Sequence, residues 1–240
     1  MRKFIWMFCA LILFAMLSGI VEKLATDDIQ AISKVPTTHK VVALTIDDGP
    51  HSQITPEILA ILKEKQVKAT FFVLGINVEK SPGILAQEVA DGHEIGTHTY
   101  SHPSLAKLSP QKVAVEFDKA ENAILPFAPK PVVFRPPGGL YNSQILETAR
   151  ERGYSVILWS IDPQDWNCPP KEKVIDEVLS KVKPGSIILL HDGQYPLPTP
   201  KALGAIIDGL RERGYTFVTV SELLAYYEVR HSFNPLSPMF

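Results

Sequence analysis

Seven short apolar runs, separated by stretches of helical periodicity, set the pattern of this chain. Several runs are continuously apolar rather than alternating, which is typical of strands covered on both faces. The runs occupy residues 41–46, 69–74, 93–97, 132–134, 155–159, 186–190 and 216–220. Between them, apolar residues recur at helical spacing, as in Ile58, Leu59, Ile61 and Leu62. The pattern therefore predicts strands and helices in alternation.

Helix boundaries are marked by residues with well-understood capping preferences. Four pairs combine an N-cap hydroxyl with a proline at the first helical position: Thr55-Pro56, Ser81-Pro82, Ser109-Pro110 and Thr199-Pro200. Gly92, Gly153 and Gly214 each end a helical stretch, as left-handed C-cap residues do. The alternation predicts a mainly parallel sheet with right-handed crossovers. Seven strands in about 190 residues favour one incompletely closed barrel, with an open doubly wound sheet as the alternative.

The amino-terminal segment differs in character from the rest of the chain. Arg2 and Lys3 precede residues 4–17, which are almost entirely apolar. A basic head before a short apolar stretch is typical of an export signal, and its length approaches that of a membrane span. We therefore expect an exported protein, secreted or membrane-anchored on the outer face, that contacts the membrane only through this segment. The expected organisation is a signal peptide or membrane anchor (1–21), a linker (22–38), a folded domain (39–228) and a C-terminal tail (229–240).

Composition narrows the classes of function. The chain has 240 residues, of which 45% are hydrophobic and 21% charged, so a large core is expected and global disorder is not. The net charge is −2 and there is no basic stripe, so nucleic acid is not an expected partner. Cys9 lies in the apolar leader and Cys168 stands alone in the body, which predicts no internal disulfide framework.

Polar side chains follow several of the predicted strands at the points where they end. Asp47 and Asp48 follow the first run, and His98 and His102 follow the third. The later runs are followed by Arg135, by Asp162 and Asp165, and by His191. Reactive side chains at the carboxyl ends of several strands are typical of an α/β-barrel active site.

The aspartates and histidines form a candidate hydrolytic metal site. Asp47 and Asp48 point to opposite sides of their strand, so one can bind a metal while the other faces water or substrate. His98 and His102 are four residues apart, and a helical or tightly turned backbone places both on one face. One carboxylate and two imidazoles leave coordination positions open, as catalysis requires. The alternatives are a simple Asp-Asp-Gly-Pro turn and a structural histidine pair.

Two further residues suggest acid–base chemistry. Arg135 is expected to pair with Asp47 and to lower the pKa of that carboxyl, an ordinary loop salt bridge being the alternative. His191 is either a buried structural histidine or, because it shares a rim with the metal candidates, a general acid. Asp162 or Asp165 would orient His191 and raise its pKa.

Five ordered segments resemble the motifs of the polysaccharide deacetylases, which form carbohydrate esterase family 4 and contain the NodB homology domain. The resemblance spans about residues 39–228, and five motifs in order are far more specific than any one of them. It implies an α/β fold, a distorted (β/α)7 barrel with mainly parallel strands. The segments are Thr45-Ile46-Asp47-Asp48-Gly49-Pro50, His98-Thr99-Tyr100-Ser101-His102, Arg135-Pro136-Pro137-Gly138-Gly139, Asp162-Pro163-Gln164-Asp165-Trp166 and Leu189-Leu190-His191.

The resemblance also implies an activity. Family members remove N-acetyl groups from polysaccharides that contain N-acetylglucosamine, such as peptidoglycan or chitin. By the family's pattern, Asp48, His98 and His102 would bind one divalent metal ion, usually Zn²⁺, with Co²⁺ or Ni²⁺ as alternatives. An acetylated polysaccharide at the cell wall would be the partner, and we expect a monomer.

The remaining roles are also carried over from the family. Asp47 would be the general base, positioned by Arg135, and His191 would be the general acid, tuned by Asp162. Gly138 would offer its amide to the oxyanion, and the acetyl pocket would be lined by Trp166 and Leu189.

The chain departs from the family pattern at two positions. Gly138 stands where many members carry an aromatic residue, which would widen the groove and remove a sugar contact. Ile46 replaces a common phenylalanine, a conservative core change. Two alternative functions are an O-acetyl xylan esterase that uses the same residues and a non-catalytic glycan-binding protein of the cell wall.

Overall fold

The computed structural model describes residues 31–227. The expected signal peptide or anchor (1–21) and the tail (229–240) lie outside the described residues, so they stay expectations from sequence. Among residues 31–227, no helix is both long enough and apolar enough to span a membrane.

Within residues 31–227, seven strands form one sheet, and each predicted apolar run contributes one of them. The pairings between strands are all parallel, in the order β5-β4-β3-β2-β1-β6, with β7 pairing the start of β1. The predicted parallel sheet is therefore confirmed. The strands are β1 (Val41–Asp47), β2 (Thr70–Val73), β3 (Glu94–Thr97), β4 (Val133–Phe134), β5 (Ser155–Val156), β6 (Ile187–His191) and β7 (Thr216–Phe217).

The sheet curves into an incompletely closed barrel. The segment after β5 approaches β6 through a single parallel bridge between Ile161 and Ile188, and Ile32 makes another to Ile157. Because the two ends of the strand order meet only through such isolated bridges, the barrel is distorted rather than regular. This confirms the distorted (β/α)7 barrel over the open doubly wound sheet.

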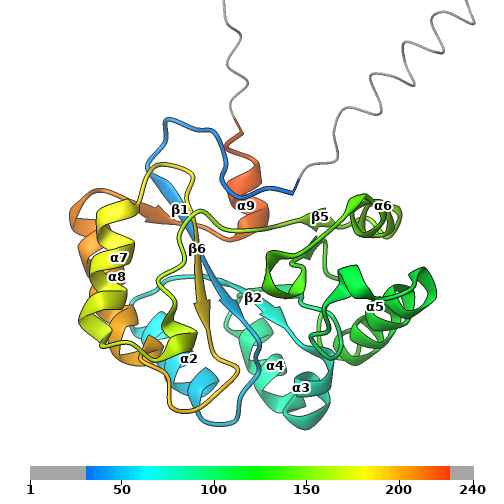
Figure 1. Cartoon of the computed structure of the whole chain (residues 1–240). Coiled ribbons are helices and arrows are strands. Elements are labelled where there is room, and N and C mark those ends of the chain that lie inside the picture. The colour runs from blue at the N-terminus through cyan, green and yellow to red at the C-terminus, as the bar shows by residue number, and fades with distance from the viewer. Residues whose placement is uncertain (1–30, 228–240) are drawn as a thin grey trace, which may run out of the picture. The chain divides into compact units, whose positions relative to one another are not determined.

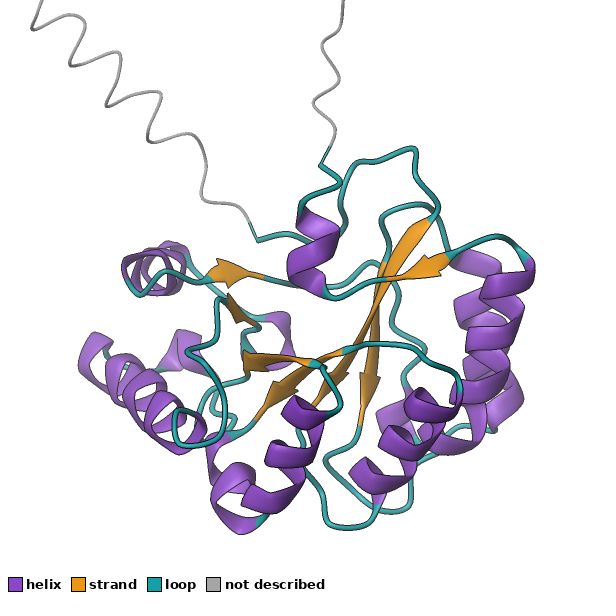
Figure 2. Ribbon diagram, turned by 180° about the vertical axis from the view of Figure 1, so that it is seen from behind, coloured by secondary structure: helices purple, strands orange, loops and turns teal. Residues whose placement is uncertain are grey.

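Helices connect successive strands and, except for the helix that follows β7, cover the outer side of the sheet, with α7 and α8 on the left of Figure 1 and α5 and α6 on the right. Figure 2 shows the same arrangement from behind. The helices are α2 (Ile54–Glu64), α3 (Gly75–Lys80), α4 (Pro82–Ala90), α5 (Pro110–Ile124), α6 (Ser143–Glu151), α7 (Lys171–Lys181), α8 (Thr199–Glu212) and α9 (Val220–Leu224), with 3₁₀ turns η1 (Leu105–Lys107), η2 (Pro137–Gly139) and η3 (Asp165–Asn167).

The predicted helix boundaries were right at some positions and wrong at others. Ser109 caps α5 by accepting a hydrogen bond from the backbone of Lys112, and Gly92, Gly153 and Gly214 are left-handed as predicted. Thr55 and Thr199, however, lie inside the first turns of α2 and α8 and are not N-caps. Their hydroxyls donate instead to the buried carboxylates of Asp192 and Asp165, respectively.

Strand β1 explains why the runs are continuously apolar. Leu44 and Ile46 pack into the cluster shared with the outer helices, whereas Val41 and Ala43 pack into the cluster inside the barrel. All seven residues of β1 are buried, so both faces are mainly apolar until the strand ends at Asp47. The exception is Thr45, whose buried hydroxyl donates to the carbonyl of Ile188.

Candidate active site

Parallel pairing brings the predicted catalytic residues together. Asp47 ends β1 and His191 ends β6, and these two residues are direct partners in the β1–β6 register. His98 immediately follows β3, two strands away, with its N–H donating to the carbonyl of Val73 on β2. The carboxyl ends of three strands thus deliver polar side chains to one edge of the sheet.

Asp48, His98 and His102 form a group that fits a metal ion. Their ligand atoms all lie within 4.8 Å of one another. Both Nε2 atoms are 3.6 Å from Oδ1 of Asp48, close to the roughly 3.3 Å that separates ligand atoms in a tetrahedral zinc site. That oxygen is buried and has no hydrogen-bond partner among the described residues. The group therefore has the geometry and the free acceptor that a divalent cation requires.

The protonation of His98 suits the same role. Its Nδ1 lies 2.7 Å from the carbonyl oxygen of Arg135 and donates to it, which leaves Nε2 free to face Asp48. Burial lowers the pKa of His98 to about 3, so the ring is neutral, as a metal ligand must be.

Arg135 and Asp47 form a buried ion pair. The guanidinium donates from Nη1 to Oδ1 of Asp47 at 2.6 Å, and further to the Thr45 hydroxyl and the Leu158 carbonyl. The Phe72 ring lies 4.1 Å from Cζ. The pairing was expected, but the expected lowering of the Asp47 pKa was wrong. Burial raises that pKa by more than Arg135 lowers it, which makes Asp47 a stronger base.

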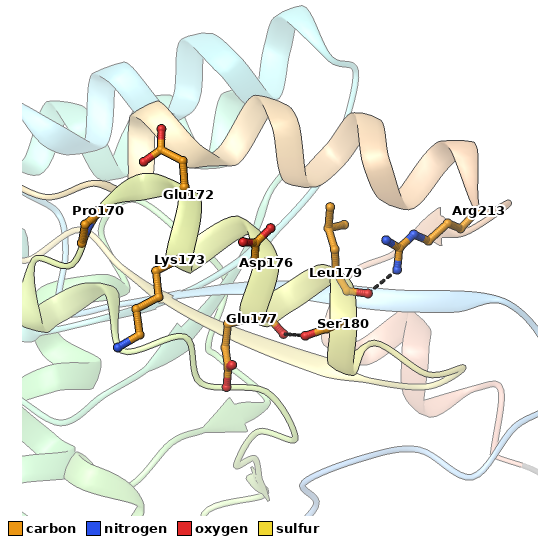
Figure 3. A pocket seen from close by; sticks show the side chains of 8 residues that line it. All are labelled: Pro170, Glu172, Lys173, Asp176, Glu177, Leu179, Ser180 and Arg213. Atoms are coloured by element: carbon orange, nitrogen blue, oxygen red, sulfur yellow. Dashed lines mark hydrogen bonds between the residues drawn. The ribbon is translucent and has the colours of Figure 1, made fainter.

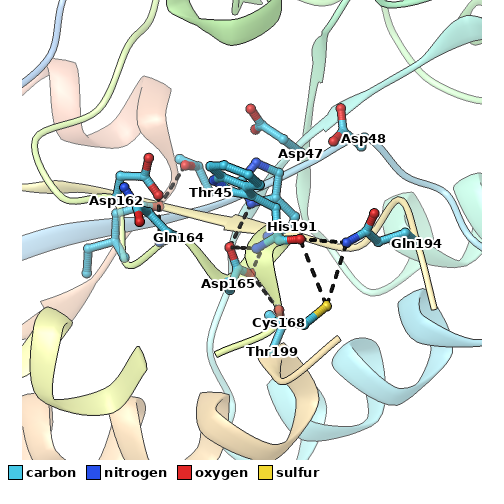
Figure 4. Close-up of polar contacts among 12 residues, drawn as sticks. Thr45, Asp47, Asp48, Asp162, Gln164, Asp165, Cys168, His191, Gln194 and Thr199 are labelled. Carbon is cyan, nitrogen blue, oxygen red and sulfur yellow. Dashed lines mark hydrogen bonds and ion pairs between the residues drawn. The ribbon is translucent and has the colours of Figure 1, made fainter. Parts of the chain in front are cut away.

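His191 is held by Asp165, one of the two aspartates that the sequence left open, and not by Asp162, which the family resemblance implied. Nδ1 of His191 lies 2.7 Å from Oδ1 of Asp165, and the backbone N–H of His191 donates to Oδ2 at 2.8 Å (Figure 4). The Thr199 hydroxyl donates to the same Oδ2 at 2.5 Å. Asp162 instead accepts the backbone N–H of Gln164.

The local backbone explains why Asp165, rather than Asp162, contacts His191. The 3₁₀ turn η3 begins at Asp165 and is flanked by two left-handed residues, Gln164 and Cys168, which turn the fully buried Asp165 inward. Burial alone would lower the pKa of His191, but the hydrogen bond and charge of Asp165 outweigh it and raise that pKa to about 9. His191 is therefore equipped to carry a proton at neutral pH.

One cavity of about 410 Å³ collects these side chains. Asp47, Asp48, His98, His102 and His191 line it, and the predicted substrate-binding residues line the same cavity: Gly138, Trp166 and Leu189. Asp162 is also part of the wall, together with Trp159 and Gln194, which sequence reasoning missed. Trp159 is the last residue of the apolar run 155–159 and Gln194 comes three residues after His191, and nothing in their own spacing marks them as cavity residues.

The cavity continues into a neighbouring one of about 280 Å³. Leu74, Asn77 and Gly193 line this second part, which shares Asp48 and His191 with the first. At Gly138, with φ +62°, a Cβ would meet no atom within 4 Å, so the groove is open at this position. A wider hollow of about 620 Å³ lies along α7, but none of the candidate catalytic residues lines it (Figure 3).

The comparisons with known proteins show the family to which the chain belongs. The family described as polysaccharide deacetylase matches residues 34–157. A peptidoglycan-N-acetylglucosamine deacetylase of Bacillus cereus is 40% identical over 196 residues, covering 80% of this chain and 92% of the relative. A chitooligosaccharide deacetylase of a Bradyrhizobium strain is 36% identical over 196 residues, covering 76% and 90%.

Solved structures show the same fold. A crystal structure of a peptidoglycan N-acetylglucosamine deacetylase matches with a TM-score of 0.78 and 38% identity, covering 80% of this chain and 92% of that one. A CE4 family pseudoenzyme from Bacillus anthracis matches with a TM-score of 0.79 and 30% identity, covering 84% and 71%. Since enzymes and a pseudoenzyme share this fold, activity must be argued from the site residues.

Proposed function

The chain belongs to the polysaccharide deacetylase family, and we propose that it is a metal-dependent hydrolase that removes N-acetyl groups from N-acetylglucosamine-containing polysaccharide. The observation that carries the proposal is the meeting of Asp47, His191 and the Asp48–His98–His102 group in one cavity. A decayed site would have lost one of these groups, so the complete set favours an enzyme over a non-catalytic glycan-binding protein.

Each residue has a task in breaking the amide bond. A divalent cation held by Asp48, His98 and His102 would polarise the acetyl carbonyl and acidify water. Asp47 accepts a proton from the water whose oxygen attacks the carbonyl carbon. His191 gives its proton to the amide nitrogen as the C–N bond breaks, so that acetate and a free amine leave.

The surroundings make these transfers easier. Arg135 fixes the orientation of Asp47, and Asp165 fixes that of His191. Gly138 lines the cavity, and we propose that its N–H donates to the oxyanion that forms at the former carbonyl. Trp166 and Leu189 are proposed to enclose the acetyl methyl group, because both line the same cavity.

Peptidoglycan or a chitin-type glycan is the proposed substrate, and Zn²⁺ the proposed metal, with Co²⁺ or Ni²⁺ as alternatives. The names of the two relatives support this substrate class. Export by residues 1–21, a location at the cell wall, and a monomeric state are proposed from the sequence alone.

The test is acetate release from chitin oligomers, peptidoglycan and acetylated xylan, measured in parallel with the full chain. We expect release from the N-acetylated substrates, its loss after chelation, and its recovery on adding Zn²⁺. Asp47→Asn is the control, because it should abolish release while metal binding persists. Release from xylan alone would favour the esterase, and a metal-loaded protein inactive on every substrate would refute the proposal.

A further inference from the structure

The loop that carries His102 adopts a strained backbone. Thr99 has φ +74° and His102 has φ +60°, so both are left-handed. L-residues adopt this conformation at an energetic cost, and for a β-branched residue such as Thr99 it is a clear outlier. Such a backbone persists only where contacts around it hold it in place.

Glu116 supplies contacts at the middle of the loop. From α5, its Oε2 accepts the backbone N–H groups of Tyr100 and Ser101 at 3.1 and 2.8 Å. Its Oε1 accepts the Ser101 hydroxyl at 2.8 Å. Tyr100 and Ser101 are the two residues that separate Thr99 from His102. A single carboxylate thus holds the whole interior of the strained segment through charge-assisted hydrogen bonds.

The opposite side of the loop is fixed by α3. The N–H of Gly75 donates to the carbonyl of Thr99 at 3.0 Å, and that of Ile76 donates to the carbonyl of Tyr100 at 2.9 Å. Within the loop, the Thr99 hydroxyl accepts the N–H of His102 at 3.1 Å. Helix α3 therefore donates hydrogen bonds to the carbonyl groups of the loop, and Glu116 accepts hydrogen bonds from its N–H groups. Neither partner can replace the other.

Glu116 has no other evident task. All the polar contacts that the structure gives its half-buried carboxylate go to Tyr100 and Ser101, and the ion pairs of residues 31–227 do not include it. Without it, two amide donors would lose their partner and would be satisfied only if the loop turned them toward water. That movement would shift His102 away from Asp48.

We propose that Glu116 is a positioning residue for the metal centre: it holds the 99–102 loop, which is left-handed at Thr99 and His102, in the conformation that brings Nε2 of His102 to 3.6 Å from Oδ1 of Asp48. The inference rests on the proposed metal dependence, and it concerns how the site is held rather than which residues bind. Groups that orient metal ligands in this way typically contribute about 10- to 100-fold to metal affinity.

The experiment measures metal affinity directly, by competition of the full chain with a chromophoric chelator for Zn²⁺ and by the absorption spectrum of bound Co²⁺. Glu116→Ala is expected to bind Zn²⁺ about 10- to 100-fold more weakly and to alter the Co²⁺ spectrum. Glu116→Gln keeps the shape and one acceptor oxygen, so a smaller loss is expected. It also supplies the readout if Glu116→Ala does not fold.

The matched control is Asp118→Asn, which removes a carboxylate from the same helix where it pairs with Arg152 and not with the loop. It should bind Zn²⁺ as the wild type does. Folded Glu116 variants with affinity within about twofold of the wild type and an unchanged Co²⁺ spectrum would overturn the inference. A wild-type protein that binds Zn²⁺ but releases no acetate would contradict the proposed function alone.

Discussion

Arg135 places Nη1 2.6 Å from Oδ1 of Asp47, and both side chains are buried, with Asp47 in the wall of the cavity. The other oxygen of the carboxylate, Oδ2, lies 3.8 Å from Nε2 of His98, on the side of the candidate metal ligands. The ion pair thus engages Oδ1 of Asp47, while Oδ2 faces the candidate metal ligands. A base held in this way needs no reorganisation before it accepts a proton.

Loss of one partner of the Arg135–Asp47 ion pair is expected to lower the stability of the fold. Arg135→Met should lower the free energy of unfolding by about 3–5 kcal/mol, because it leaves the Asp47 carboxylate buried without its partner. The double variant Asp47→Asn/Arg135→Met should recover part of the loss, since no buried charge remains. Urea unfolding of the wild type, both single variants and the double variant measures the coupling. A double variant no more stable than Arg135→Met would contradict this account.

The hydrogen bond from His191 to Asp165 predicts a change in both rate and pH dependence. Asp165→Asn should lower kcat by about 10²- to 10⁴-fold, because His191 loses the group that orients it as an acid. The pKa of His191, about 9 with Asp165 present, should fall toward its usual 6.5. The acid must be protonated to act, so the alkaline limb of kcat/KM should move to lower pH.

Asp162→Asn is the matched control for that measurement. Asp162 lies three residues earlier and lines the cavity, but its carboxylate bonds to the backbone of Gln164. Its variant should keep the alkaline limb of the wild type. If the alkaline limb of kcat/KM moved in Asp162→Asn but not in Asp165→Asn, Asp162 and not Asp165 would be the residue that raises the pKa of His191.

Glu88 predicts a different pH dependence, that of folding stability. Its carboxyl on α4 is fully buried, and neither oxygen has a hydrogen-bond partner among residues 31–227. Burial, and then the charge of Asp192, raise the pKa of Glu88 well above 4.5. The folded state therefore favours the protonated form, so the associated stability is fully present below about pH 4.5 and is lost as pH rises toward the folded pKa.

Glu88→Gln should abolish the loss of stability at rising pH, because a glutamine side chain stays neutral at every pH. The variant should have nearly the stability of the wild type at pH 4 and exceed it increasingly up to pH 8, by about 1–3 kcal/mol where the buried charge would form. Urea unfolding at pH 4, 6 and 8 measures the difference, with the exposed Glu57→Gln as control. Wild-type and variant stabilities that stay parallel across this range would disprove the expected shift.

The sequence predicted the sheet and the members of the site because both depend on local patterns. Continuous apolar runs mark strands buried on two faces, and polar residues at their ends must lie at one edge of a parallel sheet. Residue type also indicated a metal site made of one of the two aspartates with His98 and His102, and the family resemblance implied that the aspartate is Asp48. The structure brings these three side chains together without any adjustment of that set.

What the sequence did not predict depends on contacts between distant segments. Thr55 and Thr199 carry good N-cap sequences, yet their hydroxyls bond to carboxylates 137 and 34 residues away. The choice between Asp162 and Asp165 depends on two left-handed residues around η3, which no local preference required. The raised pKa of Asp47 depends on how deeply the fold buries it.

Thr199 is expected to affect both stability and catalysis, because it links α8 to the Asp165–His191 pair. Its buried hydroxyl donates to Oδ2 of Asp165, the carboxylate whose Oδ1 accepts from Nδ1 of His191. Thr199→Val keeps the shape but removes the donor, so it should cost about 1–3 kcal/mol of stability. It should also lower kcat about tenfold, the equivalent of 1.4 kcal/mol in the barrier, with little change in KM. Thr199→Ser restores the donor and should restore kcat.

Thr55→Val separates the catalytic effect of Thr199 from mere loss of a buried hydrogen bond. Thr55 makes an equivalent bond, 2.6 Å from its hydroxyl to Oδ2 of the buried Asp192, and that carboxylate makes no bond to the His191 ring. Both valine variants should therefore lose similar stability, while only Thr199→Val loses kcat. If the two variants lose kcat equally, the effect follows from general loosening of the fold, and Thr199 does not act through the Asp165–His191 pair.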